Sequence, residues 1–128
     1  MSVPDAHDLI TVFVVDDEPL LLDLAKTILS PLGFDIRIFN DPRKAMAEYS
    51  LAKPALVVTD YAMPGMTGME VVRQCRRINP GQKTLLLSGT VDETIYTLEP
   101  EPTRPNLFLA KPYQVRDFVQ AVQKLATR

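Results

Sequence analysis

The stretch Ala55-Leu-Val-Val-Thr-Asp60-Tyr-Ala-Met-Pro-Gly65 decides the fold, because an apolar run stops there at a carboxylate and turns into a loop. A short β-branched run bounded by proline and glycine is typical of a buried strand, and Asp60 stands at its carboxyl end. In an open α/β sheet, ligands bind at that edge. The rest of the chain therefore has to be searched for other side chains that reach the same edge.

Size, charge and cysteine content narrow the class of protein. The 128 residues fit one domain, which is long enough to bury about two-thirds of its unfolded surface. The single cysteine, Cys75, cannot form an internal disulfide and is expected in the core, in a reducing compartment. No long apolar run or signal-peptide pattern is present, so we expect a cytoplasmic protein without membrane association. Fourteen basic and sixteen acidic residues argue against direct binding of nucleic acid.

Apolar periodicity predicts five strands that alternate with helices. The strands are expected over residues 9–15, 34–39, 55–60, 83–87 and 107–110. Helices are expected from Pro19 to about Pro31, from Pro42 to about Leu51, after the capping pair Thr67 and Glu70, and over residues 115–125. This alternation predicts an α/β fold, a doubly wound five-stranded parallel sheet with helices on both faces. Residues 1–8 are expected to form a disordered tail, which leaves residues 9–128 as the domain.

The sequence also makes more detailed predictions about the buried faces of two helices and about one irregular connection. The buried face of the first helix is predicted at Leu21, Leu24, Ala25, Ile28 and Leu32, and that of the third at Val71, Val72, Cys75 and Ile78. Three arginines of the third helix, Arg73, Arg76 and Arg77, are expected on its solvated face. Residues 91–99 favour a short fourth helix, but Pro100, Pro102 and Pro105 prevent it from continuing, so this helix is expected to be short or irregular.

Polar side chains follow four of the five expected strands. They are Asp16 and Asp17 after the first, Asp60 after the third, Ser88 after the fourth and Lys111 after the fifth. Right-handed crossovers bring the carboxyl ends of parallel strands to one edge, so these side chains should meet. Three carboxylates on one rim repel one another, and a bound divalent cation is the simplest way to keep them ionised. A donor set made only of oxygen, with room for water, favours Mg²⁺.

A lysine and a hydroxyl beside such a metal suit a phosphoryl group, whose oxygens gain charge during transfer. Asp60 would then act as the nucleophile and form an acyl phosphate. Each motif alone has a plainer explanation, with Asp-Asp as a helix cap, Lys-Pro as a turn and Ser-Gly as a loop. Their joint arrival at one edge of the sheet favours the phosphoryl site.

The chain resembles the response-regulator receiver domains of two-component signal transduction. The resemblance covers residues 10–127 and is carried by Val-Val-Asp16-Asp17-Glu18-Pro, Thr-Asp60-Tyr-Ala-Met-Pro-Gly-Met-Thr-Gly, Leu-Leu-Ser88-Gly and Phe108-Leu-Ala-Lys111-Pro. It implies a flavodoxin-like sheet with the strand order 2-1-3-4-5. It also implies a regulatory phosphoprotein that is not an enzyme, except that it catalyses its own phosphorylation and dephosphorylation.

The resemblance assigns the acidic residues to phosphorylation and to Mg²⁺. Asp60 would accept a phosphoryl group from the phosphohistidine of a histidine kinase or of a phosphotransfer protein in a phosphorelay. Asp17 would bind Mg²⁺ directly and Asp16 largely through water. Asp60 and the backbone carbonyl of Ala62 would complete the metal site.

The resemblance also assigns a switch to the other side of the site. Lys111 and Ser88 would hold the phosphoryl oxygens. Phe108, three residues before the lysine, would swing inward when Ser88 moves toward the phosphate, and would reshape the surface near the fourth helix, fifth strand and fifth helix. That surface would bind a downstream effector protein or a second copy in a phosphorylation-dependent homodimer.

Two alternative functions use the same fold. A receiver-like module that binds proteins without being phosphorylated has no need of the complete set of site residues. A small phosphohydrolase with an aspartate nucleophile usually has a second acid two residues later, where this chain has Ala62. The sequence leaves open whether the domain is a stand-alone regulator or a module of a hybrid kinase.

Overall fold

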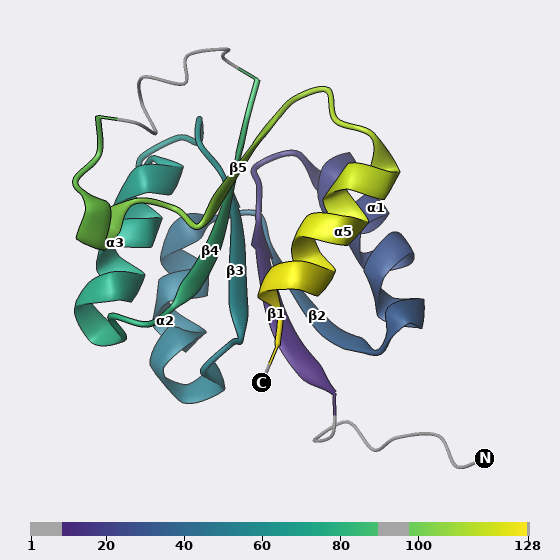
Figure 1. The fold of residues 1–128 in the computed structure, drawn as a ribbon, viewed down its shortest axis with the longest axis horizontal. Helices are drawn as coiled ribbons and strands as arrows, with labels where there is room; N and C mark the ends of the chain where they lie inside the picture. Colours follow the sequence, from purple (N-terminus) through teal and green to yellow (C-terminus); the bar gives the residue numbers. More distant parts are fainter. Residues whose placement is uncertain (1–8, 90–97, 128) are drawn as a thin grey trace.

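A parallel sheet of five strands forms the centre of the protein (Figure 1). The computed structural model describes residues 9–89 and 98–127. The strands are β1 (Ile10–Val15), β2 (Phe34–Phe39), β3 (Leu56–Asp60), β4 (Lys83–Ser88) and β5 (Leu107–Ala110). They lie in the order β2-β1-β3-β4-β5, so the predicted fold class is confirmed.

Four α-helices are present in the described residues. They are α1 (Pro19–Leu29), α2 (Pro42–Ala52), α3 (Gly68–Ile78) and α5 (Val115–Leu125). Helices α1 and α2 each begin with a proline, whose missing N–H has no intrahelical partner there in any case. The Asp41 side chain caps α2, and the Thr67 hydroxyl accepts a hydrogen bond from the N–H of Glu70 to cap α3. None of the helices in the described part of the chain is long and apolar enough to span a bilayer.

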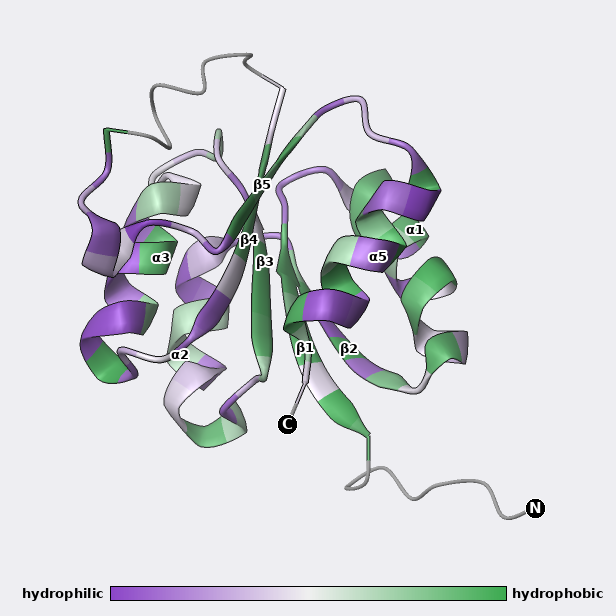
Figure 2. Ribbon diagram, in the orientation of Figure 1, coloured by the Kyte–Doolittle hydropathy of each residue, from purple (hydrophilic) through white to green (hydrophobic). Residues whose placement is uncertain are grey.

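The helices form a layer on each face of the sheet. Helices α1 and α5 cover one face, and α2 and α3 cover the other (Figure 1). Alternate residues of β1 point into the two layers, with Val12 and Val14 toward α1 and α5 and with Phe13 and Val15 toward α2 and α3. Figure 2 shows that β1 and β3 at the centre of the sheet are mainly apolar, whereas α3 and α5 carry both hydrophilic and hydrophobic residues. Because the central strands are buried on both faces, their carboxyl ends are held in fixed positions.

The predicted buried face of α1 was partly wrong. Leu24 and Leu32 are each 44 % exposed. The core side of α1 is formed by Leu22, Ala25 and Leu29. Apolar residues occupy so many positions in α1 that more than one helical stripe fits the sequence, and packing against the sheet selects one of them. The last residue of α3, Ile78, was also predicted to be buried and is 54 % exposed.

The connection between β4 and β5 is not a regular helical crossover in its described part. The short helix predicted over residues 91–99 falls largely on residues 90–97, which lie outside the described residues, as does the predicted tail over residues 1–8. From Leu98 to Leu107 the described chain contains one 3-10 turn, η3 (Glu101–Thr103), and no α-helix. This turn packs against α3. We call residues 98–106 the crossover segment.

The start of α3 lies directly against the backbone of Asp60. The N–H of Gly68 donates to the carbonyl oxygen of Tyr61 at 2.8 Å. A methyl group at Gly68 would overlap the carbonyl oxygen of Asp60, so only glycine fits this approach. The end of β3 and the start of α3 therefore support the Asp60 side chain as one unit.

Gly68→Ala should destabilise the fold, although alanine favours a helix more than glycine does. Overpacking of this kind lowers the free energy of unfolding by about 1–3 kcal/mol, which urea denaturation will measure. Gly81→Ala is the matched control, because the methyl group would lie 3.6 Å from the Asn79 side chain in an ordinary contact. Equal stability of Gly68→Ala and wild type would show that α3 is free to move away from Asp60.

Candidate functional site

Five polar side chains gather at the carboxyl edge of the sheet, where the sequence predicted them. Asp16 and Asp17 follow β1, Asp60 ends β3, Ser88 ends β4 and Lys111 follows β5. Asp60 pairs in register with Leu87, one residue before Ser88, and Ser88 pairs with Ala110, one residue before Lys111. Three neighbouring strands thus deliver a carboxylate, a hydroxyl and an ammonium group to adjacent positions.

Lys111 joins the two buried aspartates of this edge. Its Nζ atom lies 3.0 Å from Oδ2 of Asp16 and 3.2 Å from Oδ1 of Asp60. Asp16 and Asp60 are 1 % and 6 % exposed. Both contacts are therefore shielded from water, and each ion pair is stronger than one on the surface. The peptide bond that follows, between Lys111 and Pro112, is cis.

The three aspartates form a compact cluster of oxygens. One carboxylate oxygen of each of Asp16, Asp17 and Asp60 lies within 4.8 Å of the others. Asp16 also accepts a hydrogen bond of 3.0 Å from the backbone N–H of Glu18. Asp17, in contrast, is exposed to solvent. The cluster has a buried side that is held by Lys111 and an open side at Asp17.

Burial and neighbouring charges together shift the pKa values of Asp60 and Lys111. Burial raises the pKa of Asp60, the neighbouring Asp16 carboxylate raises it further, and Lys111 offsets only part of this increase. Burial alone would lower the pKa of Lys111, but its contacts with Asp16 and Asp60 outweigh that effect, and the pKa is raised. The lysine therefore stays charged, whereas Asp60 binds a proton more readily than an exposed aspartate does.

The cluster suits a small divalent cation. Its donors are carboxylate oxygens, which hard cations such as Mg²⁺ prefer over the nitrogen and sulfur donors of softer metals. The Asp16 charge that raises the pKa of Asp60 is the repulsion that a cation between the carboxylates would relieve. Asp16, Asp17 and Asp60 are the residues that would hold it.

Ser88, Ala62 and Phe108 were also predicted to belong to the site, and the structure places each of them in a different environment. Ser88 is buried, with 3 % of its surface exposed, at the end of β4. Ala62 is exposed in the loop after β3, two residues beyond Asp60. Phe108 is half-buried in β5, opposite Leu86 of β4. The roles in metal binding and switching that were predicted for these residues stay predictions.

The close approach of Gly68 to Asp60 was not anticipated from the sequence. The available signal was a glycine directly after the capping residue Thr67, in the first turn of a predicted helix. Glycine is a poor helix former, so its presence there indicates a close contact of the backbone. The pairing of Lys111 with Asp16 was likewise not predicted, since it depends on the distance between β1 and β5.

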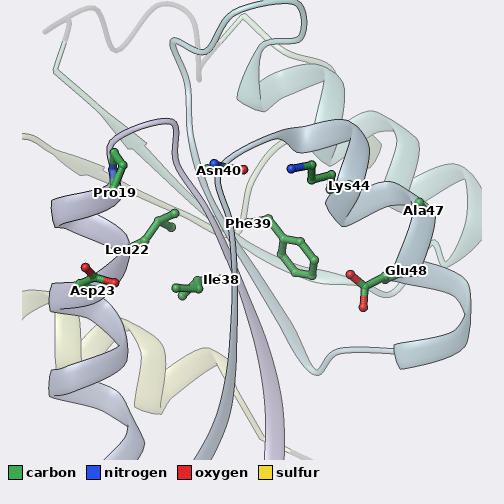
Figure 3. Close-up of a pocket in the computed structure, with 9 residues that line it drawn as sticks. All are labelled: Pro19, Leu22, Asp23, Ile38, Phe39, Asn40, Lys44, Ala47 and Glu48. Carbon is green, nitrogen blue, oxygen red and sulfur yellow. The ribbon is translucent and has the colours of Figure 1, made fainter.

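Besides a hollow of about 280 Å³ that is lined by Asp17, two larger hollows lie near this edge of the sheet. One, of about 580 Å³, follows the outer edge of β2, and Figure 3 shows Leu22 and Ile38 on its α1 side and Phe39 and Ala47 on its α2 side. None of the clustered aspartates lines it. The other, of about 400 Å³, adjoins the site directly. It is lined by Glu18, Leu21 and Leu24 at α1 and by Lys111, Pro112, Tyr113 and Val115 before α5.

Comparisons with known proteins agree with this geometry. The sequence model of the response regulator receiver domain matches residues 12–123. The chain is 31 % identical over 121 residues to the probable transcriptional regulatory protein TcrX of Mycobacterium tuberculosis, covering 93 % of this chain and 50 % of TcrX. It is 26 % identical over 116 residues to the chemotaxis protein CheY of Thermotoga maritima, covering 90 % of this chain and 96 % of CheY.

Solved structures are similar over most of the chain. The chemotaxis protein CheY4 of Vibrio cholerae superposes with a TM-score of 0.83 at 23 % identity, covering 91 % of this chain and 98 % of CheY4. The response regulator TrrA of Thermotoga maritima, solved with Mg²⁺ and beryllium fluoride, has a TM-score of 0.80 at 26 % identity. That superposition covers 91 % of this chain and 99 % of TrrA. The chain also spans about half the length of the first curated relatives that it matches.

Asp60→Asn should stabilise the protein at neutral pH when no metal is added, because it removes a buried carboxylate whose charged form is disfavoured. The pKa of Asp60 is raised in the folded protein, so the difference from wild type should shrink as the pH falls through that pKa and the carboxyl becomes neutral. Mg²⁺ should reverse the order. At about one hundred times its Kd it stabilises wild type by about 2.7 kcal/mol, and the variant by less.

Thermal unfolding with and without Mg²⁺ measures both effects. Asp23→Asn is the matched control, since it removes the same charge from the exposed side of α1 and should alter neither the stability nor the response to Mg²⁺. A wild-type protein that Mg²⁺ does not stabilise would rule out a cation site at this cluster.

Proposed function

The chain belongs to the response regulator receiver domain family, and on this premise we propose that Asp60 is its phosphoacceptor. Receiver domains are regulatory modules of two-component signal transduction. The observation that carries the proposal is the contact of Lys111 with both buried aspartates, next to an exposed carboxylate at Asp17. This arrangement provides a nucleophile, a cation site and a positive charge for phosphoryl oxygens in one place.

In the proposed reaction, a carboxylate oxygen of Asp60 attacks the phosphorus atom of a phosphohistidine in a partner protein. The oxygen–phosphorus bond forms as the nitrogen–phosphorus bond breaks. The departing imidazole nitrogen keeps the electron pair and takes up a proton, so a neutral histidine leaves. The product is an acyl phosphate on Asp60.

Residues around Asp60 would position the transferring group. The Lys111 ammonium, 3.2 Å from Oδ1 of Asp60, is close enough to bind a phosphoryl oxygen on that carboxylate. Ser88 would donate its hydroxyl to another phosphoryl oxygen. Bound Mg²⁺ would neutralise charge on the transferring oxygens. Its proposed ligands are Asp16, Asp17, Asp60 and the backbone carbonyl of Ala62.

The two alternatives fit the site less well. A module that binds proteins without phosphorylation does not need two buried carboxylates that share one lysine. Burying these charges costs more free energy than apolar packing at the same positions would. A phosphohydrolase of the aspartate type would need a second acid where Ala62 lies.

The hollow beside Lys111 supports the proposal that the phosphodonor docks there. Leu24 of α1 is 44 % exposed and Val115 at the start of α5 is 49 % exposed, and both line the hollow. Leu20, on the same helix as Leu24, is 81 % exposed. Exposed apolar residues grouped in this way mark surfaces that bind other proteins. We propose that a histidine kinase or a phosphotransfer protein docks here, within reach of Asp60.

The output of the domain is also a proposal, because the chain spans about half the length of its transcriptional-regulator relatives. We propose a cytoplasmic protein whose phosphorylated form binds an effector protein, or a second copy of itself, near β5 and α5. Direct contact with nucleic acid is not part of this proposal, since the net charge of the chain is −2. Some relatives are named DNA-binding response regulators, and the chain covers less than half of their length.

Acetyl phosphate with Mg²⁺ should add one phosphoryl group per chain, because the acyl phosphate forms on a single carboxylate. Intact-mass measurement before and after incubation will detect the gain. Asp60→Asn should lose the label, whereas the control Asp23→Asn should be labelled as wild type is. A label that survives in Asp60→Asn would place the nucleophile elsewhere. An unlabelled wild type under conditions where Mg²⁺ stabilises it would overturn the phosphoacceptor assignment.

Leu20→Ser combined with Leu24→Ser should slow phosphorylation by a phosphohistidine protein but leave labelling by acetyl phosphate unchanged. The reason is that the apolar surface of α1 serves docking and not chemistry. The donor is a purified histidine kinase or phosphotransfer domain that labels the wild-type protein. Leu51→Ser is the control, since Leu51 is 93 % exposed on α2. Equal rates in all three proteins would exclude α1 as the docking surface.

A further inference from the structure

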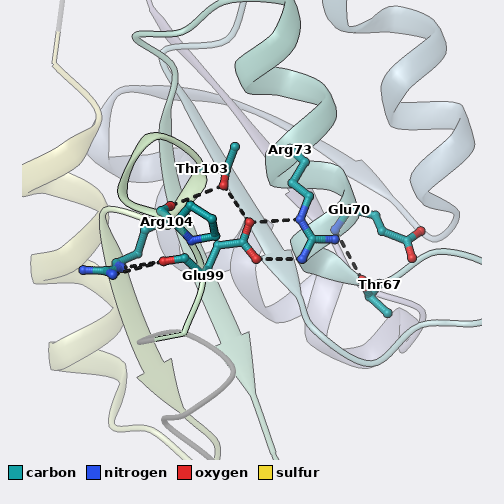
Figure 4. A network of polar contacts seen from close by, with 7 residues as sticks. Thr67, Glu70, Arg73, Glu99, Thr103 and Arg104 are labelled. Atoms are coloured by element: carbon teal, nitrogen blue, oxygen red, sulfur yellow. Dashed lines mark hydrogen bonds and ion pairs between the residues drawn. The ribbon is translucent and has the colours of Figure 1, made fainter.

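A buried carboxylate ties the crossover segment to α3. Glu99 is 7 % exposed, and both of its carboxylate oxygens accept hydrogen bonds (Figure 4). Arg73 donates from Nη2 to Oε1 at 2.6 Å and from Nε to Oε2 at 3.0 Å. The Thr103 hydroxyl donates to Oε2 at 2.6 Å. The Arg73 guanidinium holds the pKa of Glu99 below its usual value, so the pair stays charged.

Arg76, one turn further along α3, binds the same connection. Its Nη1 donates to the carbonyl oxygen of Pro102 at 3.0 Å, and its Nη2 donates to Oδ1 of Asn106 at 2.9 Å. Its Nε donates to the carbonyl oxygen of Gln82 at 2.7 Å. Arg73 and Arg76 therefore hold the crossover segment. The predicted solvated face is confirmed for Arg77, which is exposed, whereas Arg73 and Arg76 are only partly exposed and bind the segment.

The crossover segment is linked to the phosphoryl site at more than one point. The connection that contains it begins after Ser88, whose neighbour Leu87 pairs with Asp60, and β5 then leads to Lys111. Helix α3, which holds the segment through Arg73, begins with Gly68 against the Asp60 backbone. The segment is therefore bound to a helix that is fixed at Asp60, and it leads directly into the strand that precedes Lys111.

We propose that the Arg73–Glu99 ion pair opposes phosphorylation of Asp60 by holding the crossover segment in the position that belongs to the unmodified site. In this role Arg73 and Glu99 are positioning residues, because neither touches the reacting atoms. The inference rests on the proposed phosphoacceptor role of Asp60. It adds that this chain regulates the site through a contact between α3 and the crossover segment.

The site must change when a phosphoryl group arrives. The acyl phosphate brings three acceptor oxygens and about two negative charges in place of the single charge of the Asp60 carboxylate, on a rim that also carries Asp16 and Asp17. The connection that leaves β4 at Ser88 returns through the crossover segment and β5 to Lys111, so both of its ends lie at the rim that receives the new oxygens. We therefore expect the crossover segment, which leads through β5 to Lys111, to shift when the site is phosphorylated.

The ion pair resists such a displacement more than an apolar contact would. Such a pair adds little net stability compared with apolar packing, but separating its partners leaves the buried Glu99 carboxylate without compensation, whereas Arg73, whose side chain is 40 % exposed, returns to water. Two directed hydrogen bonds from Arg73 to Glu99 can form at one position of the segment only, and the Thr103 hydroxyl orients the same carboxylate from within the segment. The pair therefore favours the unmodified conformation, and its loss should favour the phosphorylated one.

Beryllium fluoride, a non-covalent stand-in for the phosphoryl group, provides the test. Its Kd is measured at saturating Mg²⁺ by following backbone amide signals in NMR spectra, which also report whether each variant is folded. Glu99→Gln should bind beryllium fluoride at least about fivefold more tightly than wild type, the lower end of usual coupling between sites. The Kd for Mg²⁺ alone should be unchanged, because the cluster at Asp16, Asp17 and Asp60 is not altered.

Further variants separate a regulatory role from a merely structural one. Thr103→Val removes the hydroxyl bond to Glu99, and a longer one to the carbonyl oxygen of Pro100, but keeps the ion pair, so it should shift the affinity in the same direction by a smaller factor. Arg73→Lys keeps the charge but loses the paired geometry and should lie between wild type and Glu99→Gln. Arg77→Gln is the control, since Arg77 is exposed on the same helix and should bind as wild type does.

The outcomes distinguish this inference from the proposed function. If wild type binds Mg²⁺ but not beryllium fluoride, the phosphoacceptor assignment fails and the inference fails with it. If wild type binds both and Glu99→Gln, Arg73→Lys and Thr103→Val bind with unchanged or weaker affinity, only the inference is overturned. If these variants also lose thermal stability without tighter binding, the ion pair is structural. Tighter binding in the predicted order, with unchanged Mg²⁺ affinity, supports the proposal.

Discussion

Two buried aspartates share one lysine, and the rest of the structure serves to keep that arrangement in place. Asp16 and Asp60 stand at the ends of neighbouring strands that are buried on both faces, so they cannot move apart to reduce their repulsion. Lys111 reaches both because β5 runs parallel to β1 and β3 and ends at the same edge. A flexible surface would relax such a cluster. In the packed sheet the repulsion persists, and a cation near Asp17 would relieve it.

The sequence predicted the strands and the edge residues well because both depend on local patterns. The expected strand bounds agree with the structure to within one residue, and parallel topology then forces the strand ends together. Helix faces were less predictable, because α1 has apolar residues on more than one stripe, and Leu24 remains exposed beside Lys111. The contact of Gly68 with Asp60 and the pairing of Lys111 with Asp16 depend on distances between elements, which no local pattern contains.

The crossover segment shows this limit most clearly. Arg73 and Arg76 lie outside the apolar stripe of α3, so helical periodicity assigns them to solvent. The partner of Arg73 is Glu99, 26 residues away in the chain, and an ion pair at that separation leaves no periodic signal. The prolines of the segment exclude a regular helix, but they do not indicate which surface the segment will cover. Placing it requires the three-dimensional position of α3.

Two routes connect Asp60 to the crossover segment, and neither passes through α1. Through its side chain, Asp60 contacts Lys111 at the end of β5, the strand that follows the segment. Through its backbone, it supports Gly68 and thus α3, where Arg73 binds Glu99. The α1 side of the site is left with its own hollow and exposed apolar residues. A phosphodonor docked on α1, as we propose, would leave the crossover segment uncovered. The contact between Arg73 and Glu99 could then open while the donor is still bound.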